Sequence, residues 1–143
     1  MKKYYSNNFS YTNVFKKMSI NSEIVTQMIY GDSFLIIKKQ KEWFKIRIKE
    51  DGYIGYVKKK KFVFYVKPTH KVCKLFANIY KNPHRSRINK KLTYGSKIRI
   101  TNIKSSFRKF ENYWIKAECI KPISYKSKNI FSKIKIFKNI KYS

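Results

Sequence analysis

The chain has 143 residues and a formal net charge of +28, from 35 lysines and arginines against 7 acidic residues. Hydrophobic residues make up 43% of it and aromatic residues 17%, which argues against disorder and favours packed cores in one ordinary domain or two small ones. No stretch approaches the roughly 18 consecutive apolar residues of a membrane span, and no apolar signal region follows the N-terminus. The sequence therefore predicts a cytoplasmic protein without a membrane span.

The excess of basic residues has two interpretations. Lysines and arginines that neutralise phosphates would make the chain a nucleic-acid-binding protein. The alternative is codon bias, because lysine, isoleucine, asparagine, tyrosine and phenylalanine are all abundant, whereas only five residues are arginine and two are alanine. Nucleic-acid readers rely on arginine for bidentate and stacking contacts. We therefore favour the compositional interpretation and expect no specific nucleic-acid partner.

The N-terminal half contains a series of short strand patterns. Residues 1–10 show no clear period and are expected to form a loose leader. A strand is predicted at 13–17, a turn at Tyr30-Gly31-Asp32 and a fully apolar strand at 34–37. Trp43 then opens a further strand after a charged connection.

A hairpin is predicted around Asp51-Gly52, because this dipeptide supplies the positive φ angles that a tight type I′ turn requires. The run after it, Tyr53-Ile54-Gly55-Tyr56-Val57, places apolar residues at even spacing. A hairpin alone is marginally stable in water, so neighbouring strands must complete its sheet. The lysines at 58–61 are expected to form a solvated turn before a closing strand that ends near 66.

The pattern then repeats beyond Pro68. Asn78-Ile79-Tyr80 follows Asn13-Val14-Phe15 at an offset of 65, and Tyr94-Gly95 follows Tyr30-Gly31 at an offset of 64. Ile98-Arg99-Ile100 is matched loosely to Leu35-Ile36-Ile37, and Trp114 is matched to Trp43. The second unit is expected to lack the Asp-Gly hairpin and to run from 118–120 directly into its closing strand.

These patterns predict an all-β protein made of two tandem small, partly open β-barrels. The predicted divisions are a leader at 1–10, a first barrel at 11–67, a second barrel at 68–123 and a short C-terminal helix within 124–143. The helix is inferred from the spacing of Ile130, Phe131, Ile134 and Phe137, although a strand through Ile134 and Ile136 is the alternative.

The motif Asp51-Gly52-Tyr53-Ile54-Gly55-Tyr56-Val57, with Tyr30-Gly31-Asp32 and Trp43, resembles a bacterial SH3-like domain. The resemblance is to the first of two such domains that precede an NlpC-type, papain-like cysteine peptidase domain. Lys67-Pro68-Thr69-His70 resembles the linker that opens the second domain. The resemblance covers roughly residues 11–143, and it identifies the last 20 residues as the helical start of a catalytic domain.

The resemblance implies γ-D-glutamyl peptide hydrolysis for the parent family but a non-catalytic role for this chain, since the nucleophilic cysteine and its histidine base would lie beyond residue 143. The partner would be a cell-wall peptide or a downstream catalytic domain. Asp32 and Tyr53 match positions suited to hold a substrate amine through a carboxylate and a ring face. Tyr30, Trp43 and Tyr56 could form an aromatic surface, although a core position is the favoured interpretation for Trp43. A remnant without function is a further alternative.

The inventory of cysteines and histidines predicts neither a metal site nor a cofactor. Cys73 and Cys119 lie among apolar residues, without a C-x-x-C pair, and are expected to be reduced, although pairing between them is open. His70 and His84 lie in loop-like surroundings. A catalytic cysteine needs a base within hydrogen-bond reach and a polarised setting, and neither cysteine has this pattern.

Overall fold

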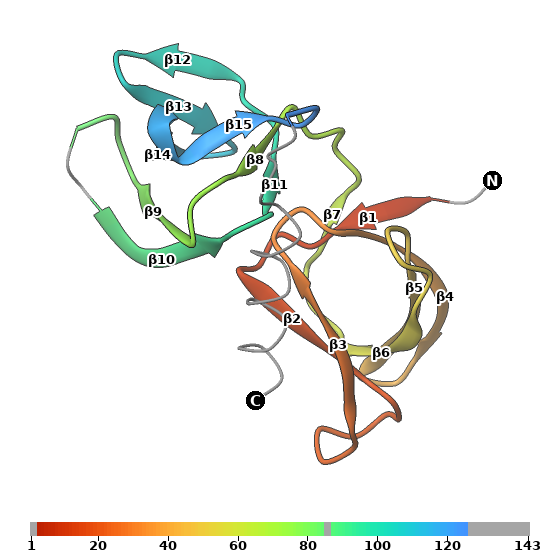
Figure 1. Ribbon diagram of the computed structural model, residues 1–143. Coiled ribbons are helices and arrows are strands. Elements are labelled where there is room, and N and C mark those ends of the chain that lie inside the picture. Colours follow the sequence, from red (N-terminus) through yellow and green to blue (C-terminus); the bar gives the residue numbers. More distant parts are fainter. Residues whose placement is uncertain (1–2, 85–86, 126–143) are drawn as a thin grey trace.

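The computed structural model describes residues 3–84 and 87–125. This part of the chain is all-β, with a single turn of 3-10 helix, η1, at Ala117–Cys119 as its helical element. Figure 1 shows the red-to-yellow strands of the first half beside the green-to-blue strands of the second. No helix in the described ranges is long and apolar enough to cross a membrane. The helix predicted within 124–143 lies almost entirely outside the described residues.

The first half forms one seven-stranded sheet in the order β3-β2-β6-β5-β4-β1-β7, with antiparallel neighbours. The strands are β1 (Tyr4–Ser6), β2 (Tyr11–Phe15), β3 (Ile24–Ile29), β4 (Ser33–Gln40), β5 (Trp43–Ile48), β6 (Ile54–Lys58) and β7 (Val63–Phe64). The sheet curls around an apolar core (Figure 1). Its described edge strands, β3 and β7, do not pair with each other, so a closed barrel is not formed.

The core of the first half follows from the alternation of side chains along its strands. On β5, Ile46 and Ile48 are buried and Arg47 between them is exposed. The same alternation buries Val57 on β6, which follows the predicted hairpin. The buried cluster consists of Val14, Met28, Phe34, Ile46, Ile48 and Val57. The sequence motif therefore forms one arm of a half-buried hairpin, but its buried residues are Gly55 and Val57. The evenly spaced Ile54 is 46% exposed and Tyr56 is only half-buried, so the sequence predicted the wrong buried face for this arm.

The second half divides its strands between two sheets, in the orders β10-β9-β14-β13-β12 and β11-β8-β15. Its strands are β8 (His70–Val72), β9 (Phe76–Tyr80), β10 (Arg87–Thr93), β11 (Lys97–Ile98), β12 (Asn102–Lys104), β13 (Phe107–Phe110), β14 (Tyr113–Lys116) and β15 (Ile120–Pro122). Read in succession, these two orders reproduce the order of the first half if β11 and β12 together take the place of β4. In that correspondence β10, β9, β14 and β13 match β3, β2, β6 and β5, and β8 and β15 match β1 and β7. β9 also has the same burial pattern as β2.

Three expectations from the sequence need correction. The leader is not loose, because Tyr4–Ser6 form β1, which pairs with both β4 and β7. The second half lacks an Asp-Gly dipeptide and runs from η1 directly into β15, as expected, but a different hairpin takes the same place. Its strands β13 and β14 pair up to Phe110 and Tyr113 around a turn whose first residue, Glu111, has a φ of 52°.

The third correction concerns the pairing of the two tryptophans. Trp43 packs edge-to-face on Phe15, with ring centroids 5.7 Å apart, and Phe107 packs on Tyr80 in the same way at 5.2 Å. The counterpart of Trp43 is therefore Phe107, at an offset of 64, and not Trp114. Trp114 lies on β14 opposite Tyr80, which is the place that Tyr56 has opposite Phe15.

Candidate functional site at the junction of the two halves

The two halves meet at the turn Tyr30-Gly31 and the start of β11. The backbone amide of Lys97 donates a hydrogen bond of 2.9 Å to the carbonyl of Tyr30, and the amide of Gly31 donates to the carbonyl of Asn7 at 2.8 Å. Tyr30 is only 5% exposed and belongs to the core of the second half, although its backbone belongs to the first. The halves therefore share core as well as surface at this point.

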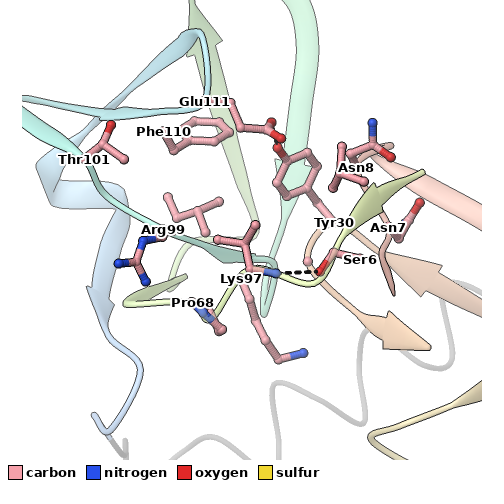
Figure 2. Close-up of a pocket in the computed structure, with 14 residues that line it drawn as sticks. Ser6, Asn7, Asn8, Tyr30, Pro68, Lys97, Arg99, Thr101, Phe110 and Glu111 are labelled. Atoms are coloured by element: carbon pink, nitrogen blue, oxygen red, sulfur yellow. Dashed lines mark hydrogen bonds between the residues drawn. The ribbon is translucent and has the colours of Figure 1, made fainter. Parts of the chain in front are cut away.

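A cavity of about 190 Å³ lies beside this turn. Figure 2 shows the ring of Tyr30 directed toward Glu111, to whose carboxylate its hydroxyl donates a hydrogen bond. The side chain of Phe110 forms part of the same wall, edge-to-face with Tyr30. The cavity is lined by Ser6, Asn7, Asn8, Tyr30, Gly31, Val63, Val66, Pro68, Lys97, Ile98, Arg99, Thr101, Phe110 and Glu111.

Asp32, the acidic residue selected from the sequence, is engaged on both carboxylate oxygens. Oδ2 accepts the backbone amide of Ile29 at 2.8 Å, which closes the turn. Oδ1 accepts the ammonium of Lys97 at 2.9 Å, and a Glu50 oxygen lies 3.9 Å from the same ammonium. Two carboxylates thus converge on one ammonium that comes from the second half. Arranged in this way, the site can bind a positively charged nitrogen.

Tyr53 lies at the tip of the neighbouring hairpin and is 53% exposed. Its backbone amide donates to the Asp51 carboxylate at 3.0 Å. The structure brings this loop close to Asp32 through Glu50, whose carboxylate accepts both the amide and the hydroxyl of Ser33. Among the hydrogen bonds and ion pairs of residues 3–84 and 87–125, none joins the side chains of Asp32 and Tyr53. The sequence analysis missed Glu50, although it stands beside Asp51 in the hairpin loop.

The residues suggested for an aromatic surface lie elsewhere. Tyr30 is 5% exposed and Trp43 is 7% exposed, so their rings do not form an open surface. Trp43 is covered on one side by Phe15 and has the ammonium of Lys58 over its ring at 5.3 Å. Tyr56 is half-buried opposite Phe15. The core interpretation of Trp43 is therefore the correct one.

The thiols do not have the setting of a nucleophile. Cys73 and Cys119 are free and half-buried, and the amide of Cys73 donates to the carbonyl of Cys119 at 2.8 Å. Burial, followed by the nearby Glu118 carboxylate and the Cys73 thiol, raises the pKa of the Cys119 thiol, which disfavours its thiolate. Within the described ranges, no group of three histidine, cysteine or acidic side chains could hold a metal ion.

Glu111 is exposed as a whole residue, but its carboxyl lies at the cavity against the Tyr30 hydroxyl, and this partial desolvation raises the pKa of the carboxyl. A carboxyl whose pKa is raised by folding stabilises the fold fully below its unfolded pKa of about 4.3 and loses that contribution as the pH rises through the folded value. We expect Glu111→Gln to remove this part of the pH dependence and to keep an oxygen acceptor for Tyr30. Thermal unfolding of both proteins between pH 4 and 8 measures the difference. A wild-type curve parallel to that of the variant would contradict it.

Comparison with known protein families finds a match for part of the first half. Residues 14–62 match the family described as the bacterial dipeptidyl-peptidase Sh3 domain. The first half therefore contains a bacterial SH3-like domain, and the resemblance inferred from its motif is confirmed. No curated protein sequence matches the chain significantly.

One solved structure extends the likeness in fold beyond the first half. A crystal structure of an NlpC/P60 family protein from Bacillus cereus ATCC 10987 has a TM-score of 0.65 and 15% identity, over 90% of this chain and 58% of that one. NlpC2 from Trichomonas vaginalis has a TM-score of 0.35 and 14% identity, over 88% of this chain and 49% of that one. This chain thus spans little more than half the length of the Bacillus cereus protein, with which it shares the fold.

Proposed function

We propose that this chain is a non-catalytic accessory unit of an NlpC-type cell-wall peptide hydrolase, built from two tandem SH3-like domains. The observation that carries the proposal is the fold shared with an NlpC/P60 family protein over 90% of the chain, together with the SH3 match in the first half. The shared length includes the second half, which the family match does not reach. The unit would position a muropeptide or a downstream catalytic domain.

The repeated backbone supports two SH3-like domains with a division near Pro68. Gly31 and Gly95 have φ angles of 88° and 87° at equivalent turns. The amide of Asn7 bonds to the carbonyl of Asp32, and the amide of Val72 bonds to the carbonyl of Ser96 in the same place. Because β1 and β8 correspond, we extend the first domain N-terminally to include β1 and keep the second domain at 68–123.

The convergence of Asp32 and Glu50 on the Lys97 ammonium supports a role in substrate positioning. Carboxylate pairs with an ammonium are charge-assisted and directional. Lys97 is 25% exposed and Asp32 16% exposed at the side chain, so solvent reaches the pair. A peptide's free amine would compete with Lys97 for Asp32, while the exposed ring of Tyr53 would cover it from the adjacent loop. The catalytic cysteine and histidine would be supplied by another domain.

The binding test adds the dipeptide L-Ala-D-Glu, or its N-acetyl form, to the full chain and follows the amide chemical shifts of the chain by NMR. We expect shifts around Asp32 and Tyr53 with the free amine and none with the acetylated form. Asp32→Asn and Tyr53→Ala should each weaken binding about tenfold, since a charge-assisted contact is worth roughly 1.5–3 kcal/mol. Glu118→Gln and Tyr11→Ala are the matched controls, since both residues are exposed on other elements, Glu118 in η1 and Tyr11 on β2. Equal binding of the acetylated dipeptide would overturn the positioning role.

The catalytic part of the proposal is tested with the tripeptide L-Ala-γ-D-Glu-L-Lys, in which the γ-carboxyl of D-Glu is joined to lysine. We expect the purified chain to leave the γ-D-glutamyl bond intact over prolonged incubation, because the raised pKa of the Cys119 thiol and the surroundings of Cys73 give no activated nucleophile. Product formation is followed by chromatography. Turnover that disappears in Cys73→Ala or Cys119→Ala would show that the chain is itself a peptidase.

A further inference from the structure

The first half has a groove lined by both basic and apolar side chains. It lies along β4 and its neighbours β1 and β5, and its volume is about 630 Å³. Four cationic side chains line it, from Lys3, Lys38, Lys39 and Arg47. Between them the groove is lined by Leu35, Ile36 and Ile37, and Ile37 is 44% exposed. We call this feature the β4 groove.

The β4 groove continues onto β7 at the edge of the sheet. Phe64 on β7 is 62% exposed, stacks on Tyr5 with ring centroids 5.2 Å apart, and has the ammonium of Lys3 5.6 Å from its ring centre. Lys3 and Tyr5 both line the groove. Phe64 therefore adjoins the β4 groove through its contacts with Tyr5 and Lys3.

The cations of the β4 groove have no carboxylate partners. The ion pairs found in residues 3–84 and 87–125 are those of Lys97 with Asp32 and Glu50, and no acidic residue lines the groove. Such a surface attracts anions strongly. A second copy of the chain is disfavoured as the occupant, because each copy carries a net charge of +28.

The aromatic rings of this surface argue against nucleic acid as the occupant. Single-stranded nucleic acids bind basic grooves through bases stacked on free ring faces. The ring of Tyr5 is already sandwiched between Phe34, at 6.1 Å, and Phe64, at 5.2 Å. Phe64 has Tyr5 and the Lys3 ammonium on its ring. Apart from Tyr5, the apolar side chains that line the groove are aliphatic, and aliphatic side chains suit acyl chains better than bases.

We propose that the β4 groove and Phe64 form a docking surface for an anionic phospholipid bilayer, with Ile37 and Phe64 entering the headgroup region and the four cations contacting lipid phosphates. Peripheral binding of this kind needs both signals, apolar insertion and a cluster of basic residues. The surface supplies the two signals side by side. This docking is independent of any role in positioning peptides.

The experiment measures sedimentation of the full chain with vesicles of phosphatidylcholine alone or mixed with phosphatidylglycerol, at two salt concentrations. We expect binding to the anionic vesicles only. Replacing Lys38, Lys39 and Arg47 by alanine should weaken it roughly a hundredfold at low salt, at about fivefold for each cation. Replacing the exposed Lys81, Lys91 and Lys104 of the second half is the matched control, which should retain most of the binding.

Apolar insertion is tested separately, because charge alone would attract a chain of this composition to any anionic surface. Ile37→Ser and Phe64→Ser should each weaken vesicle binding about fivefold. Ile103→Ser, at a side chain 64% exposed in the second half, should leave it unchanged. Circular dichroism checks that each variant is folded. If Phe64→Ser disturbs β7, the vesicle binding of Ile37→Ser alone decides whether insertion occurs.

Three results would overturn the proposal. The first is equal loss of binding in the two triple variants, which would show attraction by total charge. The second is full vesicle binding by both serine variants of the groove, which would exclude insertion. The third is a single-stranded oligonucleotide that binds more tightly than the anionic vesicles and loses affinity in Phe64→Ser, which would make the groove a nucleic-acid site.

Discussion

Replacing Gly31 by alanine should lower the free energy of unfolding by about 3 kcal/mol or more, through backbone strain and overpacking together. Gly31 has a φ of 88°, which L-residues with a side chain rarely adopt. A Cβ built there would lie 2.2 Å from the carbonyl oxygen of Lys97. That oxygen belongs to the backbone of β11 and cannot rotate away, so the turn and β11 would have to separate. The hydrogen bond from the Lys97 amide to Tyr30 would then be lost.

Gly95→Ala is the matched control for this prediction. Gly95 has nearly the same φ, 87°, at the equivalent turn of the second half, but a Cβ there would meet only the Ile29 side chain, at 3.6 Å. It should therefore cost about 1 kcal/mol from backbone strain alone. Urea unfolding of the two variants separates strain from close approach. Equal losses would contradict the tight junction between the halves.

The hairpin and the repeat could be predicted from local chemistry. Asp51-Gly52 indicated the turn, but the connection between β5 and β6 spans 49–53, and only Gly52, not Asp51, has the positive φ that a type I′ turn requires at both positions. The even spacing indicated a strand with one buried face but selected the wrong face, because Gly55 and Val57 are the buried residues. Tyr30 and Tyr94 gave the offset of 64 because each precedes a glycine with positive φ. Applying the same offset of 64 to Trp43 would have given Phe107 as its counterpart in the second half. Matching tryptophan to tryptophan was wrong because packing on Phe15 and Tyr80 requires a large ring, not an indole.

The candidate site was only partly predictable, because its contacts join residues far apart in the sequence. Asp32 could be selected from its motif, but nothing in the motif indicates that Lys97 neutralises it. The place of Tyr30 in the core of the second half is equally non-local. Glu111 lies at a turn that the sequence analysis did not expect. Local patterns therefore predicted the strands, whereas the junction depends on how the two sheets meet.

Asn7→Ala should be the second large effect, with a loss of about 3 kcal/mol in the free energy of unfolding, because several buried polar groups would lose their partners together. Asn7 is fully buried at the end of β1. Its Nδ2 donates to the carbonyls of Phe9, Met28 and Ile29 at 3.1–3.3 Å. Its Oδ1 accepts the hydroxyl of Thr12 at 2.8 Å, and Thr12 is itself only 2% exposed. The side chain thus ties β1 to β2 and β3, across a sheet in which β1 pairs only with β4 and β7.

Asn8→Ala is the control, since it removes the same side chain one residue later. Asn8 donates a single exposed hydrogen bond, of 3.3 Å, to the carbonyl of Lys61, so we expect a change within about 0.5 kcal/mol. The equivalent of Asn7 in the second half is Val72, which is 1% exposed and packs in the apolar core. Asn7→Val therefore separates packing from hydrogen bonding. If the polar contacts dominate, the valine variant will be nearly as unstable as the alanine variant in urea unfolding. A valine variant as stable as the wild type would show instead that filling the space at the end of β1 is sufficient, as it is at Val72.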